Sequence, residues 1–79
     1  MPEVFRFYGF SFFYYSKEHE PIHIHVEGKD GYAKYELQEE SFVMVEVHNI
    51  KRNDLKKIEQ VIEDNKDLII KHWNNYFNR

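Results

Sequence analysis

The sequence contains no cysteine, only two prolines and three glycines, and no long apolar run. Without cysteine the chain can form neither a disulfide framework nor a thiolate metal site, which is typical of proteins from reducing compartments. No segment approaches the roughly 18 apolar residues that a membrane helix needs, and the first residues lack the pattern of a signal peptide. We therefore expect a cytoplasmic protein that does not enter a membrane.

Aromatic side chains, in contrast, are abundant. They make up 18% of the 79 residues, and apolar residues make up 42%, as expected of a folded rather than a disordered chain. A chain of this length builds one hydrophobic core and not two, because small domains bury only roughly 60% of the surface that their unfolded chains expose. The sequence thus predicts a single domain over residues 1–79, with aromatic residues supplying much of its core.

Charge is distributed unevenly along the chain, although the net charge is only −3. Residues 1–47 contain four Lys/Arg against nine Asp/Glu, whereas residues 48–79 contain seven against five. If the protein binds nucleic acid, we expect the basic residues of the second part, including Lys51 and Arg52, to contact phosphate. The more ordinary explanation is the solvated start of a helix.

The first half of the chain has the residue types of β-strands. Two aromatic stretches, 4–8 and 11–15, are separated by a glycine and predict a hairpin with Phe5 and Phe7 facing the core. A later run, 42–47, is apolar on both faces. Such a run is typical of a strand that lies inside a sheet or under a helix.

The clearest hairpin joins residues 22–27 and 32–37 across the turn residues 28–31. Both stretches alternate strictly between apolar and polar residues, so each has one core face and one polar face. If Glu27 pairs with Tyr32, every core-facing residue meets another core-facing residue. On the polar face, this register pairs His25 with Lys34 and His23 with Glu36.

After residue 53 the apolar residues recur with a helical period. We expect helices over about 54–64 and 66–77, or one long helix bent at Asn65. The predicted fold is α+β: an antiparallel sheet of four to five strands over about 4–47, followed by C-terminal helices over about 54–77 packed on one face.

The strongest candidate for a functional site is the cluster His19-x-Pro21-x-His23-x-His25. Histidines two apart on a strand project from one face with Cβ atoms about 7 Å apart, so their imidazoles can converge on one ion or one phosphate. As a metal site, His23 and His25 supply two ligands, His19 the third, and Glu36 or another nearby glutamate completes the set. Such a site suits divalent Zn, Ni or Mn. With an open coordination position it could activate water, as in a metal-dependent hydrolase.

The same cluster also allows chemistry without a metal. An imidazole titrates near pH 6.5, so His23 and His25 could act as general base and acid in a ribonuclease-like cleavage, with Glu36 beside them. Arg6, Lys34 or the tyrosines Tyr14, Tyr15 and Tyr32 could then hold the phosphate or stack on bases, and the sequence does not choose among them. The alternative is a non-enzymatic protein-interaction domain, in which both histidines are solvent-facing residues on the open face of the sheet.

Several motifs occur together along the chain: Met1-Pro2-x-Val4-x-Arg6-Phe7-x-Gly9-Phe10, Phe12-x-Tyr14-Tyr15-Ser16, Glu18-His19-x-Pro21-x-His23-Ile24-His25-Val26, Ala33-Lys34-x-x-Leu37, Leu55-x-x-Ile58-x-x-x-Ile62 and Trp73-x-x-Tyr76-Phe77. Together they resemble a small bacterial family catalogued as domain of unknown function 4160. Members typically read His-x-Pro-Pro-His-x-His, and this chain has Ile22 where the second proline would stand, with all three histidines retained.

Genes of that family often lie beside another small gene. The resemblance therefore implies one component of a toxin–antitoxin-like two-gene module, with a small partner protein encoded nearby. A homo-oligomer is also compatible with the sequence. An exposed edge strand could pair two copies, and the sequence alone does not identify which strand lies at the edge of the sheet.

Overall fold

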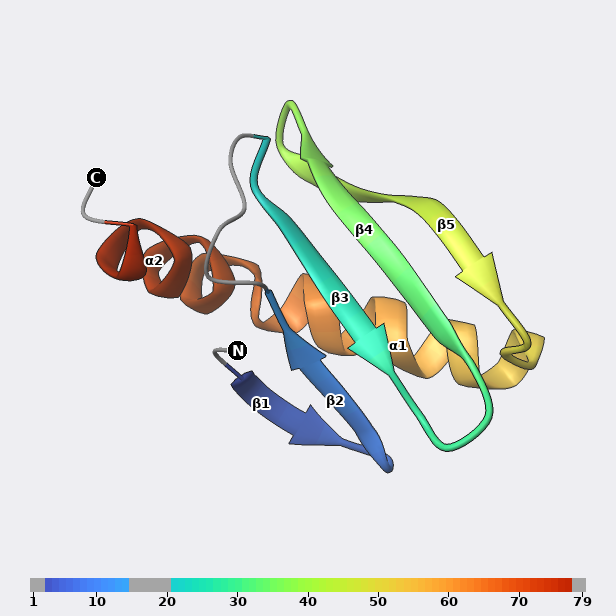
Figure 1. The fold of residues 1–79 in the computed structure, drawn as a ribbon. Coiled ribbons are helices and arrows are strands. Elements are labelled where there is room, and N and C mark those ends of the chain that lie inside the picture. The colour runs from blue at the N-terminus through green and yellow to red at the C-terminus, as the bar shows by residue number, and fades with distance from the viewer. Residues whose placement is uncertain (1–2, 15–20, 78–79) are drawn as a thin grey trace.

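The computed structural model describes residues 3–14 and 21–77 (Figure 1). Five strands form one antiparallel sheet in the order β1-β2-β3-β4-β5, so each strand pairs with its neighbours in sequence. Two helices follow and cover one face of the sheet, which confirms the predicted α+β fold. The elements are β1 (Glu3–Phe7), β2 (Phe10–Phe13), β3 (His23–Glu27), β4 (Tyr32–Gln38), β5 (Ser41–His48), α1 (Arg52–Asp64) and α2 (Lys66–Tyr76).

The predicted register of the central hairpin is confirmed. Glu27 pairs with Tyr32, and the pairing continues in step to His23 and Glu36 at the other end. The turn between the strands is closed by a hydrogen bond from the Gly28 N–H to the Gly31 carbonyl at 2.9 Å. Because both strands carry one apolar face, a shift of one residue would expose the whole apolar set, and this disfavours any other register.

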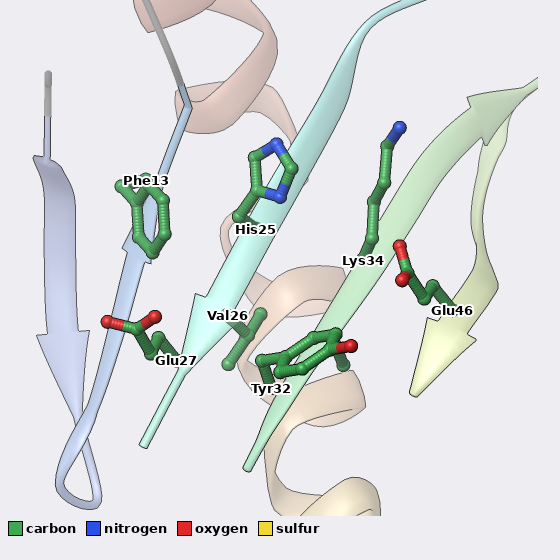
Figure 2. Close-up of a pocket in the computed structure, with 8 residues that line it drawn as sticks. Phe13, His25, Val26, Glu27, Tyr32, Lys34 and Glu46 are labelled. Atoms are coloured by element: carbon green, nitrogen blue, oxygen red, sulfur yellow. The ribbon is translucent and has the colours of Figure 1, made fainter. Parts of the chain in front are cut away.

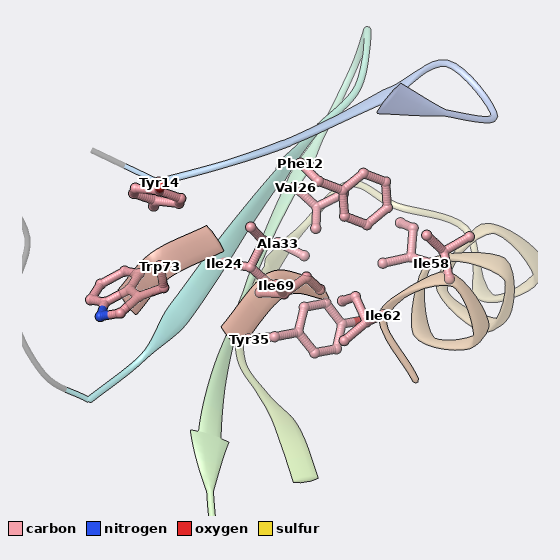
Figure 3. Packing of buried hydrophobic residues seen from close by; sticks show 11 residues of the cluster. Phe12, Tyr14, Ile24, Val26, Ala33, Tyr35, Ile58, Ile62, Ile69 and Trp73 are labelled. Carbon is pink, nitrogen blue, oxygen red and sulfur yellow. The ribbon is translucent and has the colours of Figure 1, made fainter. Parts of the chain in front are cut away.

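The hydrophobic core lies between the sheet and the helices (Figure 3). The helix-facing residues of β2, β3 and β4 meet Ile58, Ile62, Ile69 and Trp73 from the two helices. The helices are separate at Asn65, as the polar interruption predicted, and the Asn65 side-chain amide donates to the Val61 carbonyl at 2.8 Å. No helix in the described part of the chain is long and apolar enough to cross a membrane.

Two predictions about strand environment are only partly right. The apolar strand β5 contacts α1, but it lies at the edge of the sheet and not inside it, and most of its residues are exposed. At the opposite edge, Phe5 packs against the core, but Phe7 remains 42% exposed. Both errors have one cause. Residue composition reports how well a segment suits a pleated surface, whereas strand order is decided by long-range pairing.

Candidate functional site

No described helix covers the sheet face opposite α1 and α2, and we call this side the open face. Because side chains alternate along each strand, cross-strand partners on this face form rows across the sheet. The rows are Arg6, Ser11, Glu27, Tyr32 and His48; then Glu3, Phe13, His25, Lys34 and Glu46; then His23, Glu36 and Val43; then Gln38 and Ser41.

A shallow hollow of about 270 Å³ lies on the open face over the central strands (Figure 2). The His25 ring stacks on Phe13 of β2, with centroids 5.4 Å apart and planes 18° from parallel. Lys34 and Glu46 continue the row on β4 and β5. The hollow therefore combines an aromatic wall, an imidazole and charged groups of both signs.

His23, unlike His25, is buried, with only 4% of its surface exposed. Its Nδ1 lies 2.8 Å from the Pro21 carbonyl oxygen. A carbonyl oxygen only accepts hydrogen bonds, so Nδ1 must carry the proton, and in a neutral ring Nε2 then carries the lone pair. The expectation that both histidines are solvent-facing is therefore wrong for His23, because the start of β3 lies against α2.

The rings of His23 and His25 lie close together, as their spacing on the strand predicted. Their centroids are 5.2 Å apart and their planes are nearly perpendicular, at 84°. The other side of His23 faces Trp73 of α2, at a centroid distance of 5.1 Å. The His23 ring therefore lies between His25 and Trp73.

The third predicted ligand, His19, lies outside the described residues. Within residues 3–14 and 21–77, no group of three or more His, Cys, Asp or Glu side chains is placed to hold a metal ion. His23 and His25 are thus the described members of the predicted set. Glu36, the predicted carboxylate, is the cross-strand partner of His23 on β4.

The four residues predicted to contact nucleic acid do not form one surface. Arg6 lies on β1, where its guanidinium pairs with Glu3 at 3.0 Å. Lys34 lies in the middle of the open face, whereas Lys51 and Arg52 precede and begin α1 in the other layer. Among the described strand residues, the open face also carries more acidic than basic side chains: Glu3, Glu27, Glu36 and Glu46 against Arg6 and Lys34.

One carboxyl group on this face has a perturbed pKa. The Ser11 hydroxyl donates a hydrogen bond to Glu3, and this bond lowers the Glu3 pKa, with a smaller contribution from the nearby Arg6 charge. Glu3 is therefore held in its charged form. Its charge is paired with the Arg6 guanidinium, 3.0 Å away.

Several residues that shape the site were not identified from the sequence. Phe13 stacks on His25, but the register between β2 and β3 depends on a long connection that no local pattern specifies. Tyr14, the next residue, is fully buried, and its hydroxyl lies 2.7 Å from Nδ1 of His72 on α2. Burial, and to a lesser degree Tyr76, raises the pKa of Tyr14 to about 12. The sequence named Tyr14 only as a candidate for holding phosphate or stacking on bases, and its complete burial shows that this prediction is wrong.

Comparison with known families gives one match. The model of a domain of unknown function, DUF4160, matches residues 9–74, which include every described element except β1 and the last residues of α2. No curated protein and no solved structure matches the chain.

Proposed function

The chain belongs to the DUF4160 family, and from its site geometry we propose that it binds a divalent transition metal through His23 and His25, with His19 as the third ligand. The observation that carries the proposal is the hydrogen bond between Nδ1 of His23 and the Pro21 carbonyl. Metal-ligating histidines almost always donate their second ring N–H to a carbonyl or carboxylate, because this bond orients the ring and directs the other nitrogen at the ion.

The separation of the two rings also supports the proposal. A tetrahedral zinc ion holds each imidazole nitrogen about 2.1 Å away, which puts each ring centroid roughly 3.2 Å from the ion. Two such rings have centroids roughly 5 Å apart at the tetrahedral angle. The observed 5.2 Å between His23 and His25 agrees with this value.

Three protein ligands leave one tetrahedral position for water, which is the arrangement of hydrolytic zinc sites. Glu36 lies across from His23 on β4 and is the carboxylate best placed to accept a proton from such a water. Zn, Ni and Mn are the candidate ions, because imidazole suits the first two and added carboxylate ligands favour the third. We prefer this function to nucleic-acid cleavage, because an acidic open face opposes phosphate binding.

The first experiment measures metal content and stability of protein purified without a histidine tag. We expect about one equivalent of zinc or nickel after loading and desalting. An ion at 100 times its dissociation constant adds about 2.7 kcal/mol to the free energy of unfolding, which corresponds to a rise of roughly 10–20 °C in Tm for a domain of this size. Less than about a tenth of an equivalent, without a thermal shift from zinc, nickel or manganese, contradicts the proposal.

The second experiment compares two histidine variants by calorimetric titration. His25→Ala should weaken zinc binding by at least about 100-fold, because it removes a ligand from the ion. His48→Ala is the matched control, because His48 also stacks on an aromatic residue of the open face, Tyr32, but belongs to the β5 end of another row. Equal affinities in the two variants would exclude His25 as a ligand.

The place of the protein in a toxin–antitoxin-like module, with a small partner protein encoded nearby, stays a prediction that follows from the family resemblance. Co-expression with the neighbouring gene product should give a stable complex. If wild-type protein slows growth and His23→Ala/His25→Ala does not, the histidine site belongs to a toxin activity. Equal growth with both proteins would remove that role.

A further inference from the structure

β5 is an edge strand with few of the features that normally protect an edge. It has eight residues, the most of the described strands, and contains neither lysine nor proline. Val43, Met44, Val45 and Val47 each expose between 39% and 43% of their surface. Proteins usually protect such edges with charges, prolines, bulges that twist the edge away or very short strands, because unpaired backbone groups recruit another strand.

The other edge of the sheet shows these protective features. β1 has five residues and carries the exposed Arg6–Glu3 ion pair. The two edges therefore differ in length, charge and apolar exposure. This contrast indicates that β5 is covered and that β1 is not.

We propose that two copies of this chain pair antiparallel through β5, about a twofold axis between Met44 and Val45, and so form one continuous sheet. The proposal does not depend on metal binding. A second copy is the occupant that fits, because the residues flanking the bulge of β5 keep their faces of the sheet when the strand is reversed.

This match depends on the bulge in β5. Lys34 pairs with Glu46 but the next residue, Tyr35, pairs with Met44, so Val45 is an extra residue. As a result Val43 and Glu46 both belong to the open face, although they are three residues apart. In an unbroken strand they would point to opposite sides.

In the proposed register the residues on either side of the bulge meet residues on their own face of the sheet. Phe42 and Val47 both face the helices, since their partners on β4 are the core-side residues Leu37 and Ala33. Ser41 and His48 both belong to the open face, where their β4 partners are Gln38 and Tyr32. Between the two copies, the pairs are Ser41 with His48, Phe42 with Val47, Val43 with Glu46, and Met44 with Val45.

Charge and length are compatible with this pairing. Glu46 is the only carboxylate of β5, and it meets Val43 of the second copy rather than the second Glu46, so like charges are not directly opposed. Its own cross-strand partner is Lys34. Eight residues span about 27 Å, and strand addition derives its affinity from main-chain hydrogen bonds over such a length.

Sedimentation equilibrium between about 1 µM and 1 mM tests the proposal. The monomer mass is 9.8 kDa. We expect the mass to rise with concentration to twice this value and no further, because each β5 edge in the dimer is already paired and cannot bind a third copy. Val45→Lys should keep the protein monomeric throughout. Leu68→Lys is the control, because Leu68 is 49% exposed on α2 and its substitution should leave the dimer intact. Circular dichroism confirms that both variants fold.

Disulfide cross-linking tests the register, because the chain has no other cysteine. Val43→Cys/Glu46→Cys places each new thiol opposite one of the second copy, at a Cα separation of about 4.5–5.5 Å that a disulfide can bridge. Val43→Cys alone leaves the two thiols about three residues apart along the strands, beyond reach. We expect a covalent dimer from the double variant only. A wild-type monomer at all concentrations, or equal masses for the two lysine variants, would overturn the proposal.

Discussion

Tyr14→Phe removes one hydroxyl from the buried contact between β2 and α2. The ring of Tyr14 packs against Trp73, Tyr76 and Phe77, with centroids 5.2 to 5.5 Å away, and phenylalanine keeps these contacts. The change therefore deletes the 2.7 Å hydrogen bond to His72 without creating a cavity. A net loss of about 1–1.5 kcal/mol follows for one such bond, or a fall in Tm of roughly 4–12 °C.

The same substitution has a pH signature. In the folded state the pKa of Tyr14 is raised from 10.0 to about 12, mainly by burial. The protonated phenol is therefore favoured by folding, so its contribution to stability is complete below pH about 10 and is lost as pH rises towards 12. A shift of this size corresponds to at most about 2–3 kcal/mol. Tyr35 acts in the same direction, because burial and Glu59 raise its pKa as well.

Urea unfolding at pH 8, 10 and 11 measures both effects. At pH 8, Tyr14→Phe should be less stable than wild type, and the difference should shrink as pH rises, because only wild type loses the Tyr14 contribution. Tyr32→Phe is the control, because Tyr32 is 43% exposed on the open face and its substitution should change little. A difference that stays constant with pH, or an absence of any difference at pH 8, would refute the reasoning.

Two further predictions concern turns and are measured by urea unfolding. Gly31→Ala should destabilise the protein by roughly 1–3 kcal/mol. A Cβ at this position would lie 2.3 Å from the backbone carbonyl oxygens of His48 and Asn49, which a change of side-chain rotamer cannot move. A variant as stable as wild type would show that the backbone of this turn can shift without cost. Glu39→Gly should stabilise the protein by up to about 1 kcal/mol, because Glu39 has a φ of 61°, a conformation that costs residues other than glycine about 1 kcal/mol or more. Glu40→Gly, at the next position without a positive φ, should not stabilise, and equal gains from the two changes would contradict the argument.

Local patterns predicted the elements and one register correctly. Alternation along β3 and β4 was sufficient to pair His23 with Glu36 and His25 with Lys34, because both strands carry a continuous apolar face. The break between the helices was visible as a polar interruption at Asn65. In each case the relevant physics acts over a few residues, as side-chain periodicity and helix termination do.

The position of β5 could not be predicted in this way. Its continuous apolar run has the composition of an interior strand, yet the meander leaves it at the edge. Composition responds to whatever finally covers a strand, including another chain. An edge strand with interior composition is therefore informative in itself, and it underlies the proposed dimer.

The histidine cluster likewise has one property set by local sequence and another set by long-range packing. The sequence by itself determined that His23 and His25 share one face of a strand, because the side-chain period of a strand is two. Only the tertiary structure decided that His23 is buried against Trp73, fifty residues later, while His25 stacks on Phe13 at the edge of an open hollow. The depth of a side chain depends on which distant segments pack beside it, and those contacts arise from the folding of the whole chain.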